Sequence, residues 1–171
     1  MKNRNIEIEQ VQKLAKDILI FSRNILLVNL RFLDIAISQL EFLPINEIST
    51  FAIDGKIFYY NPWYILESYK KNKTEVIRDY LHAISHCLFH HPFINKLVHQ
   101  GCWDLACDIA VENAINDLRL SALTNSRASQ QEKLIREINK DFGLITAERI
   151  YRYYLDQNLN DEKLVSIRQS F

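Results

Sequence analysis

The sequence has few of the residues that interrupt helices, because its 171 residues include only three glycines and three prolines. Few positions therefore suit the tight turns that a sandwich or barrel of many short strands requires. Hydrophobic residues make up 48% of the chain, which is enough to build a sizeable core. The composition excludes a disordered chain and predicts a helix-rich fold in a single domain over residues 1–171.

Net charge is also lacking, since 21 basic side chains balance 21 acidic ones. The chain thus carries no overall positive charge to hold a nucleic-acid backbone or an anionic membrane. The most apolar early stretch, residues 18–33, is interrupted by Arg23 and Arg31, so neither a signal peptide nor a membrane span is predicted. Three cysteines without CxxC spacing indicate neither a disulfide framework nor a zinc ribbon. We expect a cytoplasmic protein that binds no nucleic acid and no membrane.

The first half of the chain predicts helices around one small β-element. Residues 6–40 contain no glycine or proline and show helical spacing, so one long or kinked helix is expected there until Pro44, within a helical scaffold over residues 1–44. Apolar and aromatic residues flank Asp54-Gly55, which predicts a β-hairpin over residues 48–60. Asn61-Pro62 then predicts an N-cap and first turn of a short helix. The expected class is α+β, predominantly helical.

The second half predicts further helices separated by polar segments. Thr74 is expected to cap a helix that ends before Pro92, and another helix is expected over residues 103–118. Residues 121–130 predict a loop, followed by helices that break at Gly143 and near residues 158–160. Residues 45–120 would then hold the hairpin and the site helices, and residues 121–171 the C-terminal helices.

Two histidines, His82 and His86, lie four residues apart within the helix expected before Pro92. Residues four positions apart lie on one helical face, so both imidazoles can reach the same metal ion. The apolar residues 77, 81, 84 and 88 fall on the opposite face of the helix. A polar helix face with solvated histidines explains the pair equally well. His90 is a further candidate ligand, but its place near the helix end favours a capping or solvent-facing role.

Asp108 lies among apolar residues of the helix expected over residues 103–118, where an ionised carboxylate needs a partner. Glu112 follows one turn later on the same face. Imidazoles on one helix and carboxylates on the next predict a two-helix metal site whose ligand types are typical of zinc, although the spacing does not distinguish zinc from other divalent ions. The alternative is a structural pair between Asp108 and a backbone amide or a histidine.

Four segments together resemble a known family. They are DGKIFYYNP (residues 54–62), HAISH (82–86), WDLACDIAVE (103–112) and TAERIY (146–151). In this order they resemble the putative metallopeptidase domain that precedes a von Willebrand factor A-like domain in bacterial proteins. The resemblance covers roughly residues 45–155.

The resemblance implies a zincin-like fold, in which a short β-element packs beside a helix that carries His-Glu-x-x-His. Carried over to this sequence, it implies zinc ligands at His82, His86 and Asp108. It further implies a peptide or protein substrate, and partners of two kinds: an AAA+ ATPase and a von Willebrand A-like domain protein.

The sequence departs from this pattern at Ala83, which occupies the place of the catalytic glutamate. Alanine cannot accept a proton, and the loss of a general base costs about two to four orders of magnitude in rate. Glu112 is the candidate catalytic residue that could replace it, and the alternative is a glutamate that lies on the helix surface or supports a ligand. We therefore expect a metallopeptidase-like metal-binding domain with weak or absent proteolysis. The alternative is a non-catalytic interaction domain that works with the two implied partners.

Overall fold

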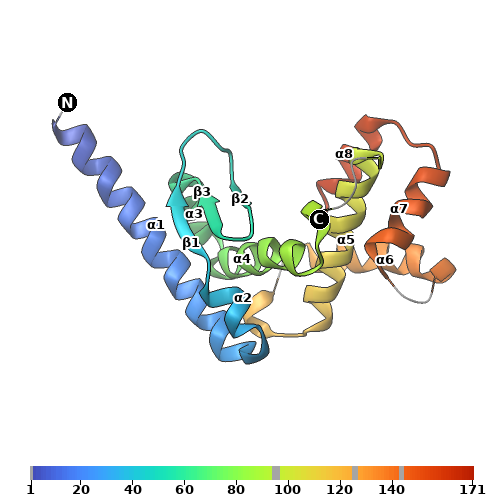
Figure 1. Ribbon diagram of the computed structural model, residues 1–171, viewed down its shortest axis with the longest axis horizontal. Helices are drawn as coiled ribbons and strands as arrows, with labels where there is room; N and C mark the ends of the chain where they lie inside the picture. Colours follow the sequence, from blue (N-terminus) through green and yellow to red (C-terminus); the bar gives the residue numbers. More distant parts are fainter. Residues whose placement is uncertain (1, 94–96, 125–126, 143–144) are drawn as a thin grey trace. The chain divides into compact units, whose positions relative to one another are not determined.

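The computed structural model describes residues 2–93, 97–124, 127–142 and 145–171 (Figure 1). Two compact units are distinguished: unit 1 comprises Met1–Phe89 and Leu120–Thr124, and unit 2 comprises His90–Arg119 and Asn125–Phe171. The described residues form a mainly helical α+β fold with a small mixed sheet, which confirms the expected class. The assignment of the whole chain to a single domain stays a prediction.

Unit 1 contains the sheet and the helices around it. Its elements are α1 (Lys2–Asn29), η1 (Arg31–Leu33), α2 (Asp34–Ser38), β1 (Glu41–Pro44), β2 (Phe51–Ile53), β3 (Ile57–Tyr60), α3 (Pro62–Lys71), α4 (Lys73–Leu88) and η3 (Ser121–Leu123). The described part of unit 2 is helical. Its elements are η2 (His91–Phe93), α5 (Gln100–Asp117), α6 (Ala128–Phe142), α7 (Ala147–Asp156) and α8 (Asp161–Arg168).

The long or kinked helix expected over residues 6–40 is interrupted at Leu30, and the strand that follows it was not expected. α1 ends at Asn29, and the buried Leu30 leaves the helical conformation with φ −128° and ψ 56°. η1 and α2 follow, and β1 occupies the segment before Pro44. β1 pairs in parallel with β3, with Phe42 opposite Phe58. Helical spacing is a local signal, whereas this pairing joins residues 16 positions apart in the chain. The spacing alone therefore did not reveal the strand.

The predicted hairpin is confirmed by the antiparallel pairing of β2 with β3, in the sheet order β1-β3-β2. Asp54 fixes the turn, because its Oδ1 accepts hydrogen bonds of 2.8 Å from the backbone amides of both Lys56 and Ile57. Gly55 follows with φ 92°, in the region that glycine adopts without a steric penalty. The turn therefore determines the register of the two strands locally.

Asparagines begin both α3 and α4. The expected cap at Asn61 is confirmed, since its Oδ1 accepts from the amide of Trp63 at 2.9 Å. The expected cap at Thr74 is wrong: Asn72 caps α4 by accepting from the amide of Thr74 at 3.1 Å. Asn72 also closes α3, because its own amide donates to the carbonyl of Ser68 at 2.8 Å. Because Asn72 serves both as the C-cap of α3 and as the N-cap of α4, α4 begins before Thr74, and Thr74 lies within its first turn.

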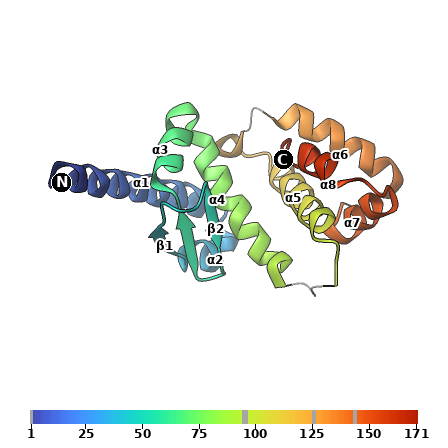
Figure 2. The same cartoon turned by 90° about the horizontal axis from the view of Figure 1, so that it is seen from above.

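α4 packs against the sheet and α1 within unit 1 (Figures 1 and 2). Tyr80 is fully buried, its ring lies 5.1 Å from that of Phe58, and its hydroxyl donates to the carbonyl of Ile37 at 2.8 Å. The expected apolar stripe is buried at residues 77, 81 and 84, but Leu88, in the last turn, is 38% exposed. The sheet and α1 thus hold α4 along most of its length.

In unit 2, α5 packs against α7, α8 and α6 (Figure 2). α5 begins at Gln100 and not at Trp103, and α6 already begins at Ala128, inside the expected loop over residues 121–130. The expected break near residues 158–160 is confirmed, since Asn160 caps α8 by accepting from the amide of Lys163 at 3.0 Å. The break predicted at Gly143 lies outside the described residues.

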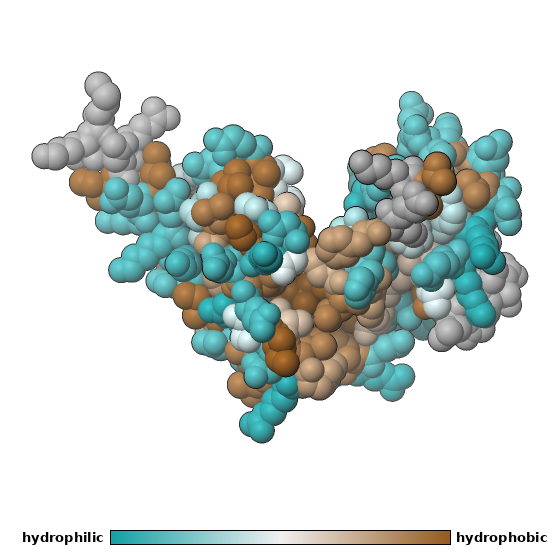
Figure 3. Space-filling model, in the orientation of Figure 1, coloured by the Kyte–Doolittle hydropathy of each residue, from teal (hydrophilic) through white to brown (hydrophobic). Residues whose placement is uncertain are grey.

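Hydrophilic residues cover much of the face drawn in Figure 3, and hydrophobic residues also reach the surface. Among the described large hydrophobic residues of unit 1, Val28, Phe32 and Ile35 are each more than 70% exposed. Across the described ranges, none of the helices combines the length and hydropathy that a membrane crossing requires.

Replacement of the cap between α3 and α4 should destabilise the protein. We expect Asn72→Ala to lower the free energy of unfolding by about 1 kcal/mol, because the first turn of α4 loses its side-chain acceptor. Urea denaturation followed by circular dichroism measures the change. Asn24→Ala, at an exposed position inside α1, is the matched control and should leave stability within about 0.5 kcal/mol of the wild type. Equal effects of the two substitutions would contradict the capping role.

Candidate metal centre

The two histidines of α4 face each other across one helical turn. The Nε2 atoms of His82 and His86 lie 2.9 Å apart, and the ring centroids are separated by 4.7 Å. Both side chains are partly buried, and α4 confirms the helix that their spacing required. The pair therefore presents two ring nitrogens at one point of the surface of unit 1.

The distance between these nitrogens fits either a shared proton or a shared cation. A neutral imidazole carries one donor and one acceptor nitrogen, so one ring can donate to the other. Two nitrogens on a tetrahedral zinc ion, each about 2.0–2.1 Å from the metal, would lie roughly 3.3 Å apart. A small rotation of either ring covers the difference from the observed 2.9 Å. The donor chemistry and the geometry of the pair thus fit a divalent metal ion.

The remaining residues around the pair are enclosed. Ala83, at the position where the family resemblance implies a glutamate, is 2% exposed. Arg78 and Ser85 are also buried, and the Ser85 hydroxyl donates to the carbonyl of Leu81 at 2.8 Å. α4 is therefore not a helix with one broadly solvated polar face, which weakens the interpretation of the histidines as ordinary surface residues.

His90 lies beyond the end of α4, which stops at Leu88. Its backbone adopts φ 59°, and its side chain is exposed, with its ring centroid 6.1 Å from that of Phe93. The structure therefore gives His90 the solvent-facing position that was favoured for it over a ligand role.

Asp108 lies in the buried middle of α5 in unit 2 and is 8% exposed. Its Oδ2 accepts a hydrogen bond of 2.5 Å from Nε of Arg168, 60 residues later in the chain. Arg168 is thus one partner of this buried carboxylate, and it is a partner that the sequence analysis did not name. Sequence reasoning missed Arg168 because no local pattern connects α5 with α8.

Asp104, one turn before Asp108, contacts the same guanidinium. Nη1 of Arg168 is 3.5 Å from its Oδ2, and the Gln100 side chain donates to its Oδ1 at 2.6 Å. Burial lowers the pKa of Arg168, but the charge of Asp108 and the hydrogen bond to it outweigh burial, so the pKa lies above its usual value. The guanidinium therefore remains charged and bound to two carboxylates.

Glu112 lies one turn after Asp108 on α5 and is 2% exposed. A carboxylate so deeply enclosed is not a residue of the helix surface. Its roles as a catalytic base or as support for a ligand stay predictions.

α7 supports the helix that carries Asp108. Thr146 caps α7, and Ala147 and Ile150 are buried in the core shared with α5. The rings of Trp103 and Tyr151 meet edge to face at 5.8 Å, and the hydroxyl of Tyr151 accepts from the backbone amide of His99 at 3.1 Å. The segment over residues 146–151 that carries the family resemblance thus contributes packing behind α5.

The cysteines differ in their accessibility. Cys102 and Cys107 are buried, whereas Cys87 is partly exposed, and all three are free thiols. Burial, and after it the charge of Asp108, raises the pKa of the Cys107 thiol above its usual value. A buried thiol with a raised pKa is a poor nucleophile and a poor metal ligand, as expected for a cysteine that serves packing.

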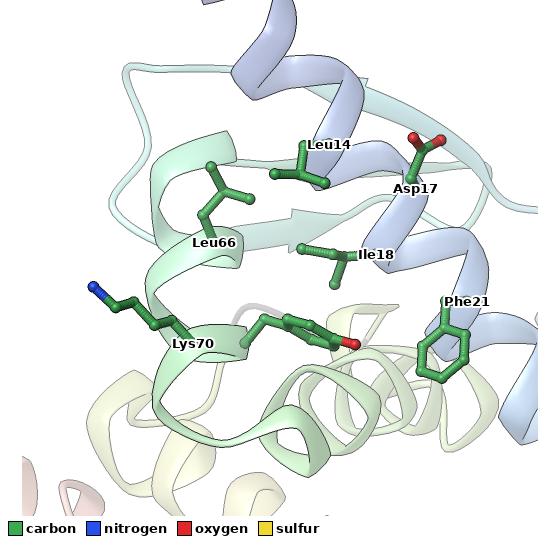
Figure 4. A pocket seen from close by; sticks show the side chains of 7 residues that line it. Leu14, Asp17, Ile18, Phe21, Leu66 and Lys70 are labelled. Carbon is green, nitrogen blue, oxygen red and sulfur yellow. The ribbon is translucent and has the colours of Figure 1, made fainter.

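A groove of about 500 Å³ lies between α1 and α3 in unit 1 (Figure 4). It is lined by Leu14, Asp17, Ile18, Phe21, Leu66, Tyr69 and Lys70. The lining is mainly apolar and includes none of the predicted site residues. The groove is therefore separate from the candidate metal ligands.

These features define a mainly helical α+β protein with a histidine pair whose chemistry suits a divalent metal. Residues 30–164 match the family model described as "Putative metallopeptidase domain", and the chain belongs to this family. Searches of curated proteins and of solved structures found no match.

The accessibility of the cysteines predicts the order of their alkylation. In the folded protein, iodoacetamide at mildly alkaline pH should modify Cys87 well before Cys107, because burial shields the latter and raises its pKa. Peptide mapping by mass spectrometry measures the order. In denaturant the two should react at similar rates. Faster modification of Cys107 in the folded state would contradict its buried position.

Proposed function

We propose that the protein is a metallopeptidase-like domain that binds a divalent metal ion through His82, His86 and Asp108. The observation that carries this proposal is the 2.9 Å approach of the two Nε2 atoms on α4. Membership of the putative metallopeptidase family supports the same function.

Asp108 is proposed as the third ligand. Each of the three side chains offers one ligand atom, a ring nitrogen from each histidine and a carboxylate oxygen from Asp108. Two nitrogens and one oxygen are a ligand set of catalytic zinc sites, which keep a fourth position open, so we propose zinc and a zincin-like fold.

The residues around the site support metal binding more than catalysis. A metal ion of this kind supplies a Lewis acid and lowers the pKa of a bound water molecule. The methyl group of Ala83 cannot accept a proton, and Glu112 is the remaining candidate for a base. We therefore propose that hydrolysis of a peptide or protein substrate is weak or absent.

A second candidate function follows from the same residue, Ala83. A domain that retains the metal ligands but lacks the base can serve as a cytoplasmic interaction module. Its proposed partners are a von Willebrand A-like protein and an AAA+ ATPase, and fold analogy alone carries this part. Affinity purification from the native host, with recovery of neither partner class, would contradict it.

Metal content tests the ligand set. Purified tag-free wild-type protein should contain about one equivalent of zinc by plasma mass spectrometry after zinc loading and desalting. His82→Ala, His86→Ala and Asp108→Asn should each lose most of this metal, because each removes one of three protein ligands. Circular dichroism establishes that every variant remains folded.

Two matched controls separate specific from incidental binding. His90→Asn removes an exposed imidazole and places a residue that tolerates positive φ at this position, where φ is 59°. Asp117→Asn removes an exposed carboxylate at the end of α5. Both should retain wild-type zinc. A folded wild-type protein without bound zinc would overturn the proposal.

Peptide hydrolysis tests the role of position 83. In a fluorogenic peptide library, zinc-loaded Ala83→Glu should cleave at least about 100-fold faster than the wild type, because it gains a general base. Ala83→Gln matches the glutamate in size without accepting a proton and should remain as slow as the wild type. If the wild type is as active as Ala83→Glu, Ala83 is no impediment. Loss of that activity in Glu112→Gln would then identify Glu112 as the base.

A further inference from the structure

α8 brings a cation to a stripe of α5 that carries two carboxylates. Gly101, Asp104 and Asp108 are spaced three and four residues apart, so they share one face of α5. Leu164 and Arg168 are four residues apart and share one face of α8. The two helices contact each other within unit 2 (Figure 2).

Packing on both sides fixes the position of Arg168. A Cβ atom at Gly101 would lie 3.4 Å from Cδ1 of Leu164, which is an ordinary van der Waals distance, so Leu164 of α8 packs beside this position of α5. Leu164 is 2% exposed in the core of unit 2. Phe171 is also buried in this core, and its amide donates to the carbonyl of Arg168 at 2.9 Å. Arg168 is therefore held between two buried anchors.

The guanidinium of Arg168 uses different atoms for the two aspartates. Nε donates to Oδ2 of Asp108 at 2.5 Å, and Nη1 lies 3.5 Å from Oδ2 of Asp104. The planar fork of arginine fixes the orientation of the carboxylate as well as its charge. The hydrogen bond from Nε therefore orients the Asp108 carboxylate, which is the ligand proposed for the metal ion.

This contact differs from an ordinary surface ion pair. The side chain of Asp108 is 11% exposed and that of Arg168 48% exposed. Arg136 and Glu132 form an i,i+4 pair on α6 whose side chains are 78% and 53% exposed. Pairs of the second kind contribute little, because water screens the charges and both side chains remain mobile. The Arg168–Asp108 contact instead orders a nearly buried carboxylate.

We propose that Arg168 is a positioning residue that holds the Asp108 carboxylate in the orientation required for metal binding. The inference rests on the proposed function, because it assigns Arg168 a role toward one of the proposed ligands. Arg168 lies outside residues 30–164, the segment matched by the family model. Carboxylates that ligate metals are commonly oriented by a second hydrogen-bonding group, whose loss costs about 10- to 100-fold in metal affinity.

The opposite effect is physically conceivable, since a guanidinium competes with a cation for the same carboxylate. Orientation predicts weaker metal binding when Arg168 is removed. Competition predicts tighter binding. A lower zinc affinity after removal of Arg168 therefore indicates a positioning residue, whereas a higher affinity indicates a residue that only neutralises Asp108.

Zinc titration of the full chain against a chromogenic chelator tests the proposal. Arg168→Ala should weaken zinc binding about 10- to 100-fold relative to the wild type. Arg168→Lys should recover part of the affinity, because an ammonium group can donate to Asp108 but lacks the planar fork. Arg136→Ala is the matched control and should bind zinc as the wild type does.

Two further measurements separate positioning from stability. Thermal unfolding of the metal-free variants gives the folded fraction at the titration temperature. The visible absorption of bound Co²⁺ reports the coordination geometry, and it should change in Arg168→Ala but not in Arg136→Ala. Wild-type affinity or tighter binding in folded Arg168→Ala overturns the positioning role and leaves the metal site intact. A folded wild-type protein that binds no zinc overturns the proposed function and this inference with it.

Discussion

The arrangement of α5 and α8 in unit 2 depends on one constraint, which is that the buried carboxylate of Asp108 needs a partner of opposite charge. Asp108 lies in α5, most of whose residues from Cys102 to Glu112 are buried, so its charge has little access to water. Arg168 meets this requirement from α8, and it lies between two residues buried in the core of unit 2, Leu164 and Phe171. The packing of α8 on α5 therefore brings the positive charge to Asp108.

In unit 1, the packing around α4 holds the helix that carries the histidine pair in place. Asn72 fixes the start of α4, and Tyr80 ties its middle to the sheet and to α2. A helix held at these points keeps residues four positions apart on one face, so the imidazoles of His82 and His86 remain within reach of each other. The sheet and α1 thus contribute to the candidate site without supplying any of its ligands.

In the proposed function, metal binding is separated from catalysis, because the ligand types are retained and the side chain at position 83 cannot accept a proton. A bound metal ion can stabilise a fold or an interface without hydrolysing a bond. Ala83 is buried, and its methyl group adds to the packing of α4. The segment that contains Tyr151 also serves packing, since its aromatic and apolar side chains lie against α5.

The sequence by itself determined the features that depend on neighbouring residues. The hairpin at Asp54-Gly55, the cap at Asn61 and the shared helical face of His82 and His86 all follow from contacts within a few positions. Only the tertiary structure decided the break at Leu30, the parallel strand β1 and the partner of Asp108. Each of these features depends on residues that are distant in the sequence. A strand pairs with another strand, and a buried charge binds an opposite charge, only where the fold brings the two together. Local spacing predicted which residues need a partner, and packing selected Arg168 as that partner for Asp108.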